Sequence, residues 1–140
     1  MIKYFTFLFL FTLSASLAQT SFQFDQSIVV TQNGGNLELP FSGGLNAAQI
    51  QTMDVNGDGT EEMVIWDINA RQISVFKIEN GIYTFYPELA YYFPSDVNGF
   101  LVLADFDGDG KKDLFTSSPF GIRAYRNSSP VGATFPSWEL

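Results

Sequence analysis

Two short stretches of the sequence place oxygen-bearing side chains on alternate residues. Residues 54–62 are DVNGDGTEE, and residues 105–113 are DFDGDGKKD. Counted from the first Asp of each stretch, side-chain oxygens stand at positions 1, 3, 5 and 9, and a glycine at position 6 permits a sharp turn. Position 7 can add its backbone carbonyl. Oxygens spaced in this way can converge on one hard cation, and an all-oxygen ligand set favours Ca²⁺ over zinc or copper.

The sequence therefore predicts two Ca²⁺ sites, one in each stretch. The predicted ligands are Asp54, Asn56, Asp58, Thr60 and Glu62 in the first loop and Asp105, Asp107, Asp109, Lys111 and Asp113 in the second, with Thr60 and Lys111 contributing only their carbonyls. The first loop has an amide at position 3 and the longer Glu at position 9. We therefore expect it to bind Ca²⁺ more weakly than the second loop.

Two other kinds of loop share part of this pattern. An EF-hand or dockerin-type loop needs an acid at position 12 and a helix after the loop. Position 12 is Ile65 in the first loop and Thr116 in the second, and β-branched and aromatic residues follow, so we reject the EF-hand. Ordinary polar turns account for one such loop. They do not account for four carboxylates within nine residues, twice over, because like charges so close repel each other unless a cation lies among them.

Composition excludes several classes of function. The 140 residues include 7 Lys or Arg and 15 Asp or Glu, which gives a formal net charge of -8 and argues against nucleic acid as a partner. There is no His and no Cys, which excludes a disulfide framework, a Cys or His zinc site and catalysis by an imidazole or thiolate. No catalytic or organic-cofactor motif is present, so we expect a protein that is not an enzyme.

Residues 1–18 have the layout of a secretory signal peptide. Lys3 precedes an apolar stretch over residues 5–13, and small residues follow at Ser16 and Ala18. The apolar stretch is shorter than the ~20 residues that a membrane-spanning helix needs. We expect cleavage after Ala18 and a mature chain that works outside the cytoplasm, secreted or at the cell surface, with no membrane span.

The flanks of the two acidic loops repeat along with the loops. Asp54 and Asp105 lie 51 residues apart, and ISVF at residues 73–76 matches IRAY at residues 122–125 at an offset of 49. Period-two patterns predict strands at 48–53, 63–66, 72–78 and 82–86 in the first unit and at 100–104, 114–116, 122–126 and 133–138 in the second. Four short antiparallel strands repeated at about 50 residues are typical of a propeller blade.

The sequence thus predicts an all-β fold made of two four-stranded antiparallel blade units of a β-propeller. We expect an N-terminal hairpin segment at 19–47, which turns at residues 32–36, then repeat 1 at 48–99 and repeat 2 at 100–140. Propellers need four or more blades, so two units make an incomplete ring. We expect a truncated chain, or further blades or chains that complete it.

DVNGDGTEEMVIWD and ADFDGDGKKDLFTSS resemble the FG-GAP/VCBS repeat, the blade unit of integrin-α-like β-propellers. Gly43-Gly44-Leu45-Asn46 is similar to the glycine-rich lead-in of bacterial secreted members. The resemblance covers roughly residues 41–140 and implies metal ligation at positions 1, 3, 5 and 9 and by the position 7 carbonyl. It also implies a non-catalytic recognition or adhesion module whose partner is an extracellular protein or glycan. The alternative is the propeller scaffold of an extracellular carbohydrate-active enzyme.

One aromatic run has two interpretations. The last predicted strand of the first unit and the segment after it contain Tyr83, Phe85, Tyr86, Tyr91, Tyr92 and Phe93. Such side chains can stack on sugar rings, but large aromatics are mostly buried, so we expect them to pack between the two units.

Overall fold

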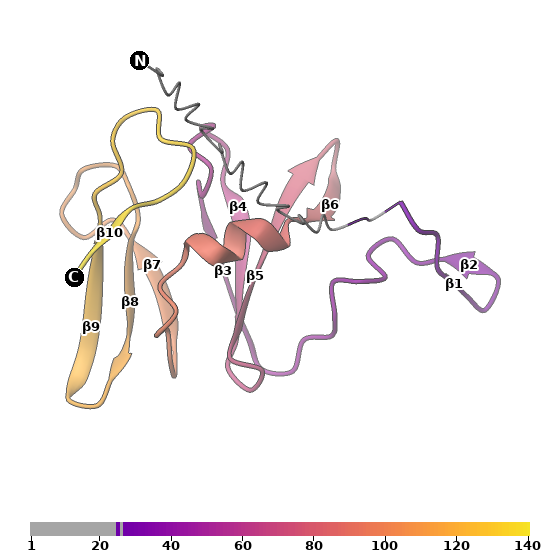
Figure 1. The fold of residues 1–140 in the computed structure, drawn as a ribbon, viewed down its shortest axis with the longest axis horizontal. Helices are drawn as coiled ribbons and strands as arrows, with labels where there is room; N and C mark the ends of the chain where they lie inside the picture. Colours follow the sequence, from indigo (N-terminus) through magenta and orange to yellow (C-terminus); the bar gives the residue numbers. More distant parts are fainter. Residues whose placement is uncertain (1–24, 26) are drawn as a thin grey trace, which may run out of the picture.

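The structure is a computed structural model that describes residue 25 and residues 27–140. The predicted signal peptide lies outside these residues. Two antiparallel four-stranded sheets stand side by side in Figure 1, with strand orders β3-β4-β5-β6 and β10-β9-β8-β7. The prediction of an all-β fold with two four-stranded antiparallel units is confirmed. The described residues do not form a closed ring.

The first sheet follows the predicted strands closely. It consists of β3 (Ala48–Met53), β4 (Glu62–Asp67), β5 (Gln72–Glu79) and β6 (Ile82–Phe85). Asn80 and Gly81 both have positive φ, 54° and 80°, in the two-residue turn between β5 and β6. Asn-Gly adopts this conformation at little cost, and it suits the twist of the flanking strands, so this sequence forms a tight hairpin.

The second sheet differs from its prediction at one strand. It consists of β7 (Leu101–Ala104), β8 (Asp113–Ser118), β9 (Gly121–Asn127) and β10 (Trp138–Glu139). The strand expected at 133–138 is wrong over most of its length, because residues 133–137 form a loop and only Trp138 is in β10. Pro136 has no backbone N–H to donate to a neighbouring strand, which accounts for the late start of pairing.

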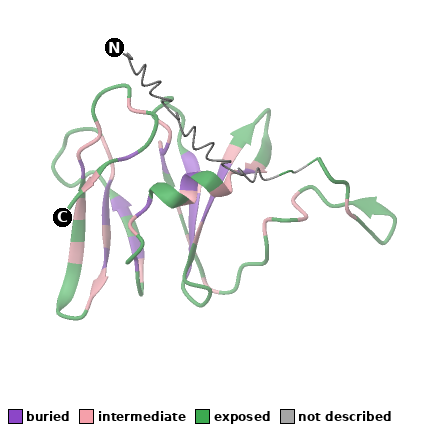
Figure 2. Cartoon of the chain, viewed as in Figure 1, coloured by how far each residue is buried: buried purple, intermediate pink, exposed green. Residues whose placement is uncertain are grey.

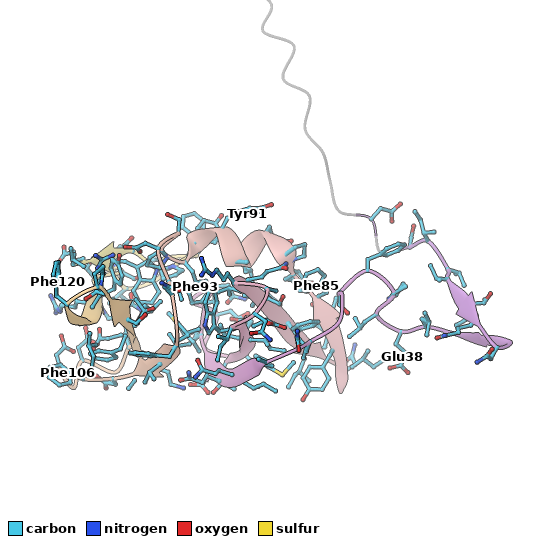
Figure 3. All side chains as sticks on the ribbon, turned by 90° about the horizontal axis from the view of Figure 1, so that it is seen from below. Glu38, Phe85, Tyr91, Phe93, Phe106 and Phe120 are labelled. Atoms are coloured by element: carbon cyan, nitrogen blue, oxygen red, sulfur yellow. The ribbon has the colours of Figure 1, made fainter. Side chains whose placement is uncertain are left out.

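A 3₁₀ helix that the sequence analysis missed connects the two sheets. The helix, η1 (Pro87–Tyr92), begins with a proline, which is favourable there because its missing N–H would have no partner. Leu89 from this helix and Phe93 just after it are buried in the core. Tyr91 lies on the outer side of the helix and is exposed (Figure 3). The aromatic run therefore packs in part, as expected, and in part faces solvent.

The N-terminal hairpin is confirmed at its turn but is much smaller than expected. β1 (Thr31–Gln32) pairs with β2 (Gly35–Asn36) around Asn33 and Gly34. Figure 1 shows this hairpin projecting away from the first sheet. The rest of the described N-terminal segment contains no strand, and Leu39 packs on the first sheet.

The main hydrophobic core lies between the two sheets, as the buried strands of Figure 2 show. Its buried members are Met53, Val55, Val64, Trp66, Val75, Leu89, Phe93, Val97, Leu101, Leu103 and Leu114. Two glutamines of β3 also cross the gap. Gln49 accepts a hydrogen bond from the backbone N–H of Leu101 at 2.9 Å, and Gln51 accepts one from Leu103 at 2.7 Å. These bonds satisfy the free backbone edge of β7 and hold the first strands of the two sheets together.

Candidate metal centre

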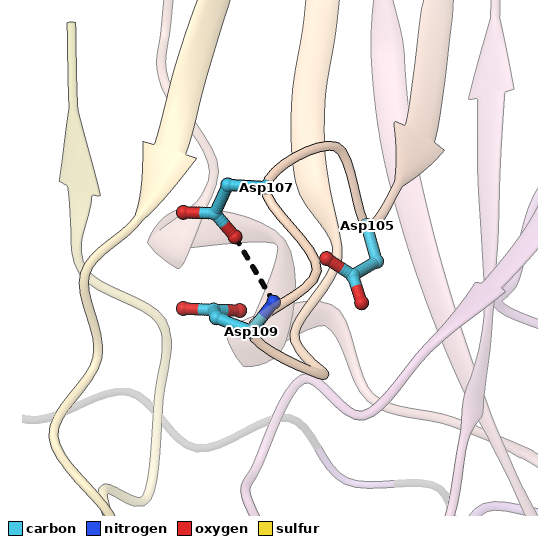
Figure 4. Close-up of side chains that lie close together, drawn as sticks. All are labelled: Asp105, Asp107 and Asp109. Atoms are coloured by element: carbon cyan, nitrogen blue, oxygen red, sulfur yellow. Dashed lines mark hydrogen bonds between the residues drawn. The ribbon is translucent and has the colours of Figure 1, made fainter.

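The second acidic loop connects β7 to β8 and brings three carboxylates together. Asp105, Asp107 and Asp109 each offer one oxygen, and these oxygens lie within 4.8 Å of one another (Figure 4). Ca²⁺–oxygen bonds are about 2.3–2.6 Å long, so two oxygens on one ion lie at most about 5 Å apart. The donor set and its spacing therefore fit Ca²⁺. Among the described residues this is the single group of three acidic side chains at such distances.

Backbone hydrogen bonds give this loop its shape. The carboxylate of Asp105 accepts hydrogen bonds from the N–H groups of Gly108 at 2.8 Å and Gly110 at 3.0 Å. Both glycines have positive φ, 78° and 87°, which other residues adopt only with strain. The position 1 Asp therefore closes the loop around itself, and the two glycines permit the tight turn that keeps the three carboxylates close.

Two basic side chains contact two of the three carboxylates, those of Asp107 and Asp109. Nε of Arg126 donates to Asp107 at 2.7 Å, and Nζ of Lys111 lies 3.1 Å from Asp109. The pKa of Asp109 is lowered, first by the backbone N–H of Lys111 and then by the Lys111 side chain, with Arg126 adding to the effect. The side chain of Lys111 thus screens negative charge in the second loop.

Asp113, the predicted position 9 ligand, lies apart from the other three carboxylates. It is buried, and its oxygens accept hydrogen bonds from the backbone N–H groups of Phe106 at 3.0 Å and Asn127 at 2.9 Å. Asp113 therefore ties the base of the loop to β9. It is not part of the group within 4.8 Å that Asp105, Asp107 and Asp109 form.

The first acidic loop, between β3 and β4, has the same backbone pattern. Asp54 accepts hydrogen bonds from Gly57 at 2.7 Å and Gly59 at 2.9 Å. Asp58 accepts one from Thr60 at 2.8 Å, and this bond is the main cause of its lowered pKa. Among the described residues, the carboxylates of this loop do not form such a group: position 3 is an amide, and the position 9 carboxylate of Glu62 has other partners.

Glu62 occupies position 9 of the first loop and is almost wholly buried. One of its oxygens accepts from the backbone N–H of Val55 at 2.8 Å, and the other accepts from the Asn56 side-chain amide at 2.9 Å. Burial raises the pKa of Glu62, although the Val55 N–H acts in the opposite direction. Glu62 thus binds the predicted position 3 ligand and fixes the base of the loop, as Asp113 does in the second loop.

A basic residue beside each loop was missed by the sequence analysis. Lys77 lies 3.9 Å from Asp58, and Arg126 contacts Asp107 and Asp109. These two residues lie 49 positions apart, which is the offset at which the β5 and β9 sequences match. The signal was therefore present in the repeat and required only that the alignment be extended by one residue.

The fold and site together define a class: an all-β protein in which two antiparallel sheets each carry an acidic, glycine-containing loop between their first two strands. Residues 54–116 match the family model described as FG-GAP-like repeat. The match begins at the first acidic loop and ends within β8, so this region is similar to an FG-GAP-like repeat. No curated protein and no solved structure matches the chain significantly. Within the described residues, no helix is long and apolar enough to span a membrane.

Proposed function

We propose that the chain is a secreted, calcium-binding repeat module of the FG-GAP/VCBS type, with one Ca²⁺ in each acidic loop. The observation that carries the proposal is the convergence of Asp105, Asp107 and Asp109 within 4.8 Å. Three carboxylates at this distance repel one another, and a divalent cation among them would remove that repulsion. A bound ion would supply charge neutralisation and a fixed loop conformation.

The residues of the second loop have distinct parts in this proposal. Asp105, Asp107 and Asp109 would hold the ion together with the Lys111 carbonyl, and Asp113 is the fifth predicted ligand. Arg126 and Lys111 already pair with these carboxylates, so we expect both cationic side chains to withdraw when Ca²⁺ binds. Asp113 would keep the base of the loop in place through its two backbone hydrogen bonds.

Thermal unfolding with Ca²⁺ and with EGTA tests the calcium site. If each site has a dissociation constant near 0.1 mM, as in extracellular modules, about 1 mM Ca²⁺ stabilises the fold by about 1.4 kcal/mol per site. Asp105→Asn should remove the part of this stabilisation that Ca²⁺ binding to the second loop provides. Glu88→Gln, in an exposed position of η1, is the matched control and should retain the full response. A melting temperature that does not respond to EGTA would contradict calcium binding.

The role of the module is proposed to be non-catalytic recognition or adhesion outside the cytoplasm, with an extracellular protein or glycan as the partner. The family resemblance supports this role, and so does the exposure of Tyr91 and Phe120, whose rings are free to stack on a partner. Binding to arrays of glycans and of extracellular matrix proteins, with Ca²⁺ and with EGTA, is the direct assay. Tyr91→Ala and Phe120→Ala should weaken a genuine interaction, whereas turnover of a polysaccharide would instead favour an enzyme scaffold.

A further inference from the structure

The two sheets are built on the same register, so their residues can be equated one by one. Val64 pairs with Val75 across β4 and β5, and Phe115 pairs with Ala124 across β8 and β9. We call the face that carries these residues the front face of each sheet. The opposite, back face carries Ile50 paired with Ile65 in the first sheet, and Leu101 paired with Thr116 in the second.

Inside the molecule, a front face meets a back face. The first sheet contributes its front-face residues Val64 and Val75 to the core between the sheets. The second sheet contributes Leu101, Leu103 and Leu114, which all lie on its back face. The contact is therefore head to tail, and the same kind of contact can in principle be repeated at both ends of the molecule.

The residues left exposed at the ends are those whose equivalents form the internal contact. On the front side, Val55 is 1% exposed, whereas its equivalent in the second loop, Phe106, is 81% exposed. Ile122, the equivalent of the half-buried Ile73, is 71% exposed. On the back side, Leu101 is 1% exposed and its equivalent Ile50 is 59% exposed. Figure 3 shows Phe106 at the end of the molecule that the second sheet forms.

We propose that two copies of this chain associate head to tail, with the front face of the second sheet of one copy against the back face of the first sheet of the next. The patch on the front face consists of Val102, Phe106, Phe115, Ile122 and Ala124. Leu39 already covers the back face around Ile65, Phe76 and Phe85. The contact with a second copy is therefore centred on β3 at Ile50, as the internal contact is centred on β7 at Leu101.

Charge complementarity favours a second copy as the occupant. Position 8 is Glu61 in the first loop and Lys112 in the second, and Nζ of Lys112 lies 2.6 Å from Glu61 across the internal contact. When the first sheet of one copy follows the second sheet of another, Lys112 again faces a Glu61. At position 8, opposite charges thus alternate along the stack.

The contact between copies is weaker than the internal one. Gln49 and Gln51 bond to the β7 backbone in the internal contact, but the residue equivalent to Gln51 is Val102, which cannot form such bonds. Association therefore depends on apolar burial and on concentration. A head-to-tail contact gives a ring if the rotation between copies closes and an open stack if it does not.

The test uses one variant for each face and measures mass by analytical ultracentrifugation over a range of concentrations. Ile122→Asp blocks the front face, and Ile50→Asp blocks the back face. Val131→Asp replaces an exposed apolar residue in the loop after β9 and is the matched control. Circular dichroism checks that each variant is folded, and none of these positions is a predicted calcium ligand, so the calcium response of each variant is an independent readout.

We expect the unmodified chain and Val131→Asp to self-associate with rising concentration, and each blocked variant alone to stay monomeric. An equal mixture of the two blocked variants should form a complex of one copy of each, because one free front face and one free back face remain. Self-association of Ile50→Asp as strong as that of the unmodified chain would show that the front face pairs with itself and would overturn the proposal. A chain that stays monomeric at every concentration would overturn it as well.

Discussion

The two repeat units have the same strands and the same kind of acidic loop, but the two loops have different surroundings. In both, the position 9 acid accepts a hydrogen bond from the residue after the first Asp, Val55 in one loop and Phe106 in the other. The first loop is pressed against the second unit: a Cβ at Gly57 would lie 1.9 Å from the carbonyl oxygen of Ala133, whereas a Cβ at Gly108 would meet nothing within 4 Å.

This difference shows that equivalent residues of two repeat units can have different roles when the units pack against each other. The first loop forms part of the contact between the sheets, and its buried Glu62 is occupied with backbone and amide partners. The second loop is open to solvent and keeps three carboxylates together. The first loop thus contributes more to stacking, and the second is better suited to bind an ion.

The largest expected difference between the units is at position 2 of the loops. Val55→Ser removes a buried apolar side chain and leaves a hydroxyl in the core, so it should lower the free energy of unfolding by about 2–4 kcal/mol. Phe106→Ser should cost less than about 1 kcal/mol, mainly through its edge contact with Phe115. Urea unfolding at low protein concentration measures both. Equal costs would show that the second loop is as buried as the first.

The second comparison is between the glycines at position 4. Gly57→Ala must strain a backbone with φ of 71° and also displace the loop that contains Ala133, so we expect a loss of at least about 2 kcal/mol. Gly108→Ala has a similar φ of 78° but open space, and we expect only the conformational cost of about 1–2 kcal/mol. Equal losses in urea unfolding would show that the contact between Gly57 and Ala133 does not hold the units together.

The strands and the acidic loops could largely be predicted from the sequence, because they depend on local signals. The alternation of apolar residues located β3 to β9 to within one or two residues, and Asn80-Gly81 located a turn that only a few residue types adopt. The acidic loops were found for the same reason, since oxygen atoms and glycines at fixed spacing define them locally.

What could not be predicted depends on contacts between distant residues. The sequence does not show that the position 9 acids accept hydrogen bonds, Glu62 from Asn56 and Asp113 from Asn127. Asn127-Ser128-Ser129 matches a glycosylation pattern, but Asn127 is buried and its side-chain amide donates to the Lys112 carbonyl. The helix η1 forms where Pro87 fixes the backbone and Leu89 is buried in the core, and no periodic pattern in the sequence predicts it.

The third comparison concerns the affinity of the two loops for Ca²⁺. Asp105→Ala should remove more of the calcium-dependent rise in melting temperature than Asp54→Ala, because three carboxylates converge in the second loop and an amide replaces one of them in the first. With both sites filled, the larger share should correspond to about 1.4 kcal/mol. Isothermal titration of the two variants gives the order of affinities. A tighter first loop would contradict the prediction that the open loop is the better site.

The smallest effect is expected where the second strand of each sheet ends. Asp67 accepts hydrogen bonds from the backbone N–H groups of Ala70 at 3.0 Å and Asn46 at 2.6 Å, and these bonds, that of Ala70 first, hold its pKa below the ordinary 3.8. Ser118 stands at the equivalent position of the second sheet and carries no charge.

A carboxyl whose pKa is lower in the folded state stabilises the fold above its unfolded pKa, and this contribution disappears as the pH falls through the folded pKa. The stability lost in Asp67→Asn should therefore be largest near neutral pH and should shrink below about pH 4, where the native side chain also becomes neutral. Ser118→Ala should show a loss that does not change with pH over the same range. Urea unfolding from pH 7 down to about pH 3 in EGTA measures both, so that bound calcium does not contribute. A pH-independent loss in Asp67→Asn would mean that the turn of the first sheet is held by the shape of the side chain and not by its charge.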